Sequence, residues 1–188
     1  MGMGYTFRCS KCGYELEAYL GIGFLFMRQT EETIRKIKSG KYGSKAKDFF
    51  EEHPGGTVDS SNALFKCEKC GSLKVEPVLD LYKRKEGTPE PEFPFPDEDY
   101  FIKDTEFEHI CEKSGTVMKI QNMDRFLNRV MKGKIRCPDC DGHLELGELI
   151  NWDCLIKMVR CNGREGFKTL STLFRDRSST PAQDFQGL

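Results

Sequence analysis

The nine cysteines are the residues whose spacing carries the clearest chemistry. Six of them form three Cys-x-x-Cys pairs: Cys9/Cys12, Cys67/Cys70 and Cys137/Cys140. Under reducing conditions, closely spaced cysteines are metal ligands or redox centres more often than structural disulfides. The pattern therefore predicts metal binding or thiol chemistry.

Two of the pairs are followed directly by glycine, at Gly13 and Gly71. This is the form of a zinc knuckle, a tight turn whose amides point at the thiolates and whose glycine takes a positive φ. We predict one closed, structural zinc site with four thiolate ligands: Cys9, Cys12, Cys67 and Cys70. Loss of this zinc would unfold the surrounding chain. Iron in a rubredoxin-like arrangement would use the same ligands.

The remaining cysteines predict a second, less complete site. Cys111, Cys137 and Cys140 supply three thiolates. The candidates for the fourth ligand are His109, His143, Cys154 and Cys161, and our predicted set takes Cys161, which lies in a knuckle-like turn. A water at the fourth position would give the site a catalytic form. We expect a closed or empty site instead, because no acidic residue is visibly placed as a general base.

The sequence gives little support to the hypothesis that the protein is an enzyme. None of the Cys-x-x-Cys pairs precedes a convincing helix, as a thioredoxin-like redox motif would. Three histidines are present, and no spacing places a nucleophile beside one of them. The sequence also lacks a phosphate-binding glycine loop. These absences favour a binding role, with a zinc-dependent hydrolase or thiol sensor at the second site as the less favoured alternative.

A short internal match suggests how the chain is organised. Residues 7–17 and 109–119 align with cysteine, lysine and glycine in register, and Ser114 stands where a ligand is expected. We predict an α+β fold of two small zinc-ribbon-like halves, the second of them degenerate. The predicted boundaries are 1–85 and 108–175 for the halves, 86–107 for an acidic Pro-rich linker and 176–188 for a flexible tail.

Hydrophobic patterning places secondary structure around the knuckles. Apolar and β-branched residues predict strands at 14–20, 63–66 and 73–82, and helices are expected at 30–38 and 44–53, with Ser44 as an N-cap. A third helix presents one apolar face, made of Met123, Phe126, Leu127, Val130 and Met131.

Charge is balanced overall and uneven locally. The net charge of -1 excludes a globally basic nucleic-acid coat. Two segments, 28–47 and 119–136, nevertheless carry a clear excess of basic residues, whereas 86–108 holds nine acidic residues and one basic residue. No apolar run is long enough to span a membrane, and no secretory signal is recognisable, so we expect a cytoplasmic protein.

With its two Cys-x-x-Cys-Gly knuckles flanking a helical segment, the chain resembles the zinc-ribbon group. More narrowly, it is similar to uncharacterised bacterial proteins with this arrangement over about the first 82 positions. The resemblance rests on Cys9, Cys12, Gly13, Cys67, Cys70 and Gly71. It implies a structural zinc and a binding role, without a particular partner.

Two binding hypotheses follow. In the first, local basic helices bind nucleic acid or a nucleoprotein, with aromatic residues for stacking at Tyr14, Phe65 or Tyr82. In the second, the protein is an adaptor subunit that contacts only another protein, favoured by the aromatic, acidic linker.

Overall fold

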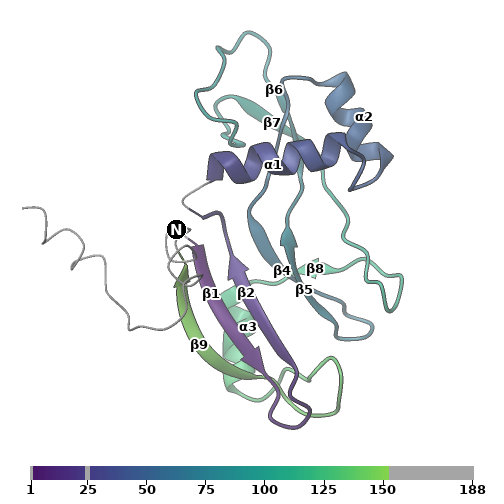
Figure 1. Ribbon diagram of the computed structural model, residues 1–188, viewed down its shortest axis with the longest axis vertical. Coiled ribbons are helices and arrows are strands. Elements are labelled where there is room, and N and C mark those ends of the chain that lie inside the picture. The colour runs from purple at the N-terminus through teal and green to yellow at the C-terminus, as the bar shows by residue number, and fades with distance from the viewer. Residues whose placement is uncertain (1, 24–25, 153–188) are drawn as a thin grey trace, which may run out of the picture.

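The computed structural model describes residues 2–23 and 26–152. Over these residues the fold is α+β, with three small antiparallel sheets and three helices (Figure 1). None of the helices in the described part is long and apolar enough to cross a membrane.

The outer sheet joins the two ends of the described chain. Strands β1 (Gly2–Arg8) and β2 (Glu15–Leu20) form a hairpin, and β9 (Glu145–Trp152) pairs with β1 on its other side. Because β1 pairs along most of its length with a strand more than a hundred residues away, residues near positions 9 and 145 lie side by side (Figure 1).

Helix α3 (Met123–Met131) packs against this sheet. The Asn122 side chain caps it by accepting a hydrogen bond from the Arg125 amide at 3.0 Å. Phe126 and Val130 are buried, and the Phe126 ring meets Phe7 edge to face at 5.4 Å. The predicted apolar face is thus confirmed at its centre, whereas Met131 at its end is exposed.

The inner sheet repeats the topology of the outer one. Strands β4 (Asn62–Lys66) and β5 (Leu73–Pro77) form a hairpin, and β8 (Lys119–Ile120) pairs with β4. In both sheets, therefore, the first hairpin strand is central and a later strand adds to its free side. Leu64 of β4 is buried in the same core as Phe7 and Phe126, which holds the two sheets together.

A third sheet is packed against helices. It contains β3 (Thr57–Val58), β6 (Leu81–Arg84) and β7 (Phe101–Thr105), in the order β3-β6-β7. Helices α1 (Phe26–Lys38) and α2 (Ser44–Glu52) enclose a second core with it. That core is made of Ile37, Ala46, Phe49, Phe50, Val58, Leu79 and Leu81.

The strand pairing does not follow the expected division into two consecutive halves. Strand β1 pairs with β9 and β4 pairs with β8, so both sheets join residues from 1–85 with residues from 108–175. The inner sheet is nested in sequence inside the outer one. The reason is that each hairpin leaves one edge of its first strand unpaired, and only a later segment satisfies those backbone groups.

The expected linker, 86–107, also contributes to the fold. Its residues 101–105 form β7, with Phe101 buried, and the Lys103 ammonium lies 2.8 Å from Asp80 beside β6. Ser44 is the first residue of α2, and Gly43 occupies the N-cap position without a side-chain cap. The expected tail, 176–188, and the end of the second half lie outside the described residues.

Candidate metal centres

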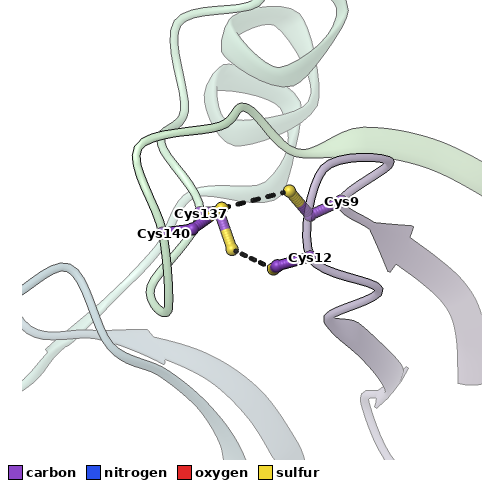
Figure 2. A group of neighbouring side chains, drawn as sticks. All are labelled: Cys9, Cys12, Cys137 and Cys140. Atoms are coloured by element: carbon purple, nitrogen blue, oxygen red, sulfur yellow. Dashed lines mark hydrogen bonds between the residues drawn. The ribbon is translucent and has the colours of Figure 1, made fainter.

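The outer cluster brings together four cysteines from two segments that are far apart in the sequence and meet at one end of the outer sheet. Its members are Cys9, Cys12, Cys137 and Cys140, whose Sγ atoms all lie within 4.8 Å of one another (Figure 2). The sulfurs of Cys9 and Cys140 are 3.6 Å apart, as are those of Cys12 and Cys137. A tetrahedral zinc with bonds of about 2.3 Å places its sulfurs roughly 3.8 Å apart, whereas a disulfide needs about 2.05 Å. The four thiolates therefore form a structural metal site that fits zinc.

The first outer knuckle is shaped by the β1–β2 turn. The Cys9 amide donates to the Tyr14 carbonyl and the Gly13 amide donates to the Cys9 carbonyl, both at 2.9 Å. Gly13 has a φ of 75°, which explains the glycine after the second cysteine. The turn aims Cys9 inward, where it is buried, and leaves Cys12 exposed.

The second outer knuckle lies between α3 and β9. The Cys137 amide donates to the Gly142 carbonyl at 2.8 Å, the Asp139 amide approaches Cys137 Sγ at 3.4 Å, and the Gly142 amide approaches Cys140 Sγ at 3.3 Å. These N–H groups direct positive ends of dipoles at sulfurs that carry negative charge when a metal is bound. The turn therefore presents both sulfurs as thiolate ligands.

Contacts around the sulfurs fasten the two outer knuckles to each other. The Lys11 ammonium pairs with the Asp141 carboxylate, and the Ser10 hydroxyl donates to Glu145 at 3.0 Å. A Cβ atom added at Gly142 would lie 2.9 Å from Cys9 Sγ. The backbone of one knuckle thus touches a ligand of the other, and only glycine fits there.

The pKa values of three outer thiols, those of Cys9, Cys137 and Cys140, are shifted in different directions. Hydrogen bonding from the Cys12 amide is the main cause that lowers the pKa of Cys9, to about 7. For Cys140 the Gly142 amide acts in the same direction, but desolvation and the neighbouring thiols together raise the pKa to about 12. Burial also raises the pKa of Cys137. A bound cation would offset the repulsion between neighbouring thiolates, and its binding would release their protons.

The inner cluster contains three cysteines: Cys67, Cys70 and Cys111. The sulfurs of Cys70 and Cys111 are 3.5 Å apart, and Cys67 and Cys111 are buried. Three thiolates at these separations can also hold a metal ion.

Hydroxyl groups surround the inner sulfurs. Cys67 Sγ lies 3.2 Å from the Ser114 hydroxyl and 3.3 Å from that of Thr116, and Cys70 Sγ lies 3.1 Å from that of Ser72. The Ser114 hydroxyl is the main cause that lowers the pKa of Cys67 to about 5, and it is also the main cause for the lowered pKa of Cys111. Cys67 and Cys111 are therefore predisposed to the thiolate form.

The structure pairs the knuckles differently from the expectation. It does not bring together the set Cys9, Cys12, Cys67 and Cys70, nor the set Cys111, Cys137 and Cys140. The cause is the nested topology. The pairing of β9 with β1 places the 137/140 knuckle beside the 9/12 knuckle, and the pairing of β8 with β4 places the 111 knuckle beside the 67/70 knuckle.

Sequence spacing gives no signal for this pairing. Cys111 is closer in sequence to the 137/140 pair than to the 67/70 pair, so loop-closure entropy alone would favour a combination that the structure does not contain. The pairing of β4 with β8 and of β1 with β9 decides it instead.

Neither histidine among the alternative fourth ligands belongs to the inner cluster. His109 directs Nε2 to the Val78 carbonyl at 3.3 Å, and its ring packs 4.0 Å from that of Phe65. His143 forms a β-bridge with Arg136 in the outer knuckle and is exposed. Cys154 and Cys161 lie outside the described residues.

The two clusters are linked at the surface by an ion pair. Lys113, in the 111 knuckle, lies 2.9 Å from Asp139 in the 137/140 knuckle.

Several grooves lie on the surface of the described residues. One, of about 450 Å³, lies beside α2 and β7. Another, of about 320 Å³, lies between the knuckles and is lined in part by Tyr14, Lys74 and Lys113. The second groove holds no further cluster of ligands among the described residues.

Comparisons with known protein families, with curated proteins and with solved structures find no match to this chain. The resemblance to the zinc-ribbon group thus rests on the knuckle motifs, and the metal assignment rests on the geometry of the cysteines.

Proposed function

We propose that the protein is a metal-stabilised binding module that contacts the phosphate backbone of a nucleic acid through the exposed face of α3. The observation that carries the proposal is a group of exposed basic side chains on and after this helix: Arg125, Arg129, Lys132, Lys134 and Arg136. Within the described residues, none of the five takes part in an ion pair, so their charges are available to an anionic partner.

Lys66 extends this basic face onto the inner sheet. Its pKa is lowered, chiefly by burial and next by the charge of Arg129, which places the two cations within electrostatic reach of each other. Lys119 on β8 adds a further cation, although Glu68 pairs with it at 3.1 Å. Clustered cations of this kind bind polyanions by releasing their counterions.

The other basic segment, 28–47, which runs from α1 into α2, is more fully engaged within the protein. Lys36 pairs with Glu32 at 2.7 Å, and Lys38 lies over the ring of Phe50 at 5.6 Å. Lys41 similarly lies 5.9 Å from the centre of the Tyr42 ring. These contacts favour α3 as the contact surface for nucleic acid.

Base stacking would involve fewer aromatic residues than the sequence suggested. Phe65 is 3% exposed and is therefore closed to a ligand, while Tyr14 and Tyr82 are half-buried. Binding through α3 should consequently depend mainly on backbone phosphates and discriminate weakly between sequences.

Fluorescence anisotropy with labelled single-stranded RNA and DNA tests the proposal. A variant with Arg125, Arg129 and Lys132 changed to Gln should lose affinity, and the slope of log K against log salt should fall by about 2, at roughly 0.7 per phosphate contact. The matched control changes Lys36, Lys38 and Lys41 to Gln. Equal losses in both variants, or binding that is independent of salt, would refute the assignment to α3.

The zinc of the outer cluster should be required for this binding. Cys9 and Cys137 belong to the same core as Phe126 and Val130, so the metal site and the buried face of α3 are one packed unit. Chelation should abolish binding together with the near-ultraviolet circular dichroism of the core, and added zinc should restore both. Full binding by metal-free protein would contradict the structural role of the metal.

An exposed apolar strip on the inner sheet favours a second candidate, a protein adaptor. Ile110, Val117 and Ile120 are 49%, 46% and 53% exposed, and they lie on or beside the edge strand β8. A protein partner should then co-purify in stoichiometric amount with the wild type, and Ile120→Asp should abolish this co-purification. Retention of the partner by Ile120→Asp would exclude this edge.

A further inference from the structure

The turn that follows Cys111 is a complete zinc knuckle in its backbone. The Cys111 amide donates to the Thr116 carbonyl at 2.9 Å and the Gly115 amide donates to the Cys111 carbonyl at 2.8 Å. The knuckle at Cys67 has the equivalent bonds, both at 2.9 Å. Gly115 also shares the positive φ of Gly71, with values of 67° and 75°. Ser114 therefore occupies the position that Cys70 occupies in the partner knuckle.

The Ser114 hydroxyl lies among the three thiols of the inner cluster. Its Oγ is 3.2 Å from Cys67 Sγ, and Cys70 Sγ is 3.5 Å from Cys111 Sγ. A tetrahedral zinc with bonds of about 2.3 Å to sulfur and about 2.0–2.2 Å to oxygen needs a sulfur-to-oxygen separation of roughly 3.6 Å. A shift of a few tenths of an ångström would accommodate the ion.

We propose that the inner cluster binds zinc through Cys67, Cys70, Cys111 and the Ser114 hydroxyl, and that the oxygen ligand makes this zinc exchangeable while the outer zinc is retained. A neutral hydroxyl is a harder and weaker donor to zinc than a thiolate. With three thiolates the occupied inner site carries one negative charge fewer than the four-thiolate outer site. Ser114 is also only half-buried, which gives competing ligands access to the metal on this side.

This inference is independent of the nucleic-acid proposal, because it concerns metal stoichiometry and exchange alone. The protein would carry one permanent zinc and one zinc that responds to the free zinc concentration. The ion pair between Lys113 and Asp139 joins the inner knuckle to the outer one, so that the exchangeable site is attached to a permanently folded neighbour.

The test is zinc content by native mass spectrometry of the full chain during titration with a chromogenic chelator. Wild type should hold two zinc ions and release one of them first. Ser114→Cys should retain that zinc to a chelator concentration about tenfold higher or more, since a thiolate binds zinc more strongly. Cys111→Ser should start with one zinc and release it only at the higher concentration.

Matched controls distinguish a ligand from a neighbour. Thr116→Val removes a hydroxyl 3.3 Å from Cys67 Sγ without changing the knuckle ligand, so it should leave the order of release unchanged. Cys154→Ser and Cys161→Ser should also behave as wild type. If either of these two variants lost the exchangeable zinc, the fourth ligand would be that cysteine and the proposal would be overturned.

Cobalt substitution provides a second measurement. With seven thiolates in the two clusters, Ser114→Cys should raise the sulfur-to-cobalt charge-transfer absorbance by roughly one-seventh. Unchanged absorbance in Ser114→Cys, or a wild type with one zinc that Cys111→Ser does not alter, would equally overturn the proposal.

Discussion

Replacing Gly142 with alanine should weaken the outer metal site and leave the inner site intact. The added Cβ would lie 2.9 Å from Cys9 Sγ and 3.2 Å from Cys140 Sγ, where ordinary contacts begin at 3.4 Å. Relief of the first contact requires a displacement of about 0.5 Å, whereas metal-ligand distances tolerate only about 0.2 Å. Overpacking of this kind typically costs about 1–3 kcal/mol before the weakened metal bonding is considered.

Differential alkylation with mass spectrometry measures the effect cysteine by cysteine. At a chelator concentration that leaves wild type protected, Gly142→Ala should expose Cys9, Cys12, Cys137 and Cys140 to alkylation. At chelator concentrations low enough to leave zinc in the inner cluster, Cys67 of Gly142→Ala should remain protected.

The matched control is Gly71→Ala in the inner knuckle. Gly71 has a φ of 75° and nothing within 4 Å of its added Cβ, so this substitution strains the backbone without a clash. Its cost, about 1–2 kcal/mol, should appear at the inner cluster only. If Gly142→Ala exposed Cys111 together with Cys137 while Cys9 stayed protected, the pairing of knuckles described above would be wrong.

Three further substitutions, one of them paired with a control, test the packing around the sites by chemical denaturation. Phe126→Ala should lower the free energy of unfolding by about 3–5 kcal/mol, since this side chain is 2% exposed. The control Leu149→Ala should have little effect, because Leu149 is 60% exposed. Similar losses in both variants would contradict the packing of α3. Asp80→Ala should lower the free energy of unfolding by about 1–3 kcal/mol, because the Asp80 carboxylate accepts hydrogen bonds from the Phe107 amide and from Lys103. A loss below about 0.5 kcal/mol would show that these bonds do not anchor β7. Gly56→Ala should destabilise the third sheet, because its Cβ would meet the Tyr82 carbonyl at 3.0 Å, and an unchanged midpoint would refute that contact.

Local features of the fold could be predicted from the sequence. The knuckle turns follow from cysteine and glycine spacing, and α3 follows from apolar residues three and four positions apart, because both are decided within a few residues. Strands β2 and β4 were found for the same reason, although their exact ends shifted by about one residue.

The partners of these elements could not be predicted in the same way. Nothing in the 9/12 knuckle distinguishes the 67/70 pair from the 137/140 pair, since all offer two thiolates. The choice is made by β1 and β9, whose pairing depends on backbone hydrogen bonds that leave no mark on the cysteine spacing. Strand β7 was missed because acidic residues and prolines dominate its neighbourhood, while the single buried side chain of Phe101 anchors it.

The nested order of the two sheets has a consequence for the newly made chain. The inner sheet is complete once β8 has left the ribosome, but the first knuckle must wait for ligands that lie 125 residues beyond Cys12. At about 5–20 residues per second, that wait lasts roughly 6–25 s. During this time the two thiols of the β1–β2 hairpin lack the other two ligands of their cluster. Metal acquisition during synthesis is therefore ordered, with the exchangeable inner zinc arriving first and the permanent outer zinc closing the fold last.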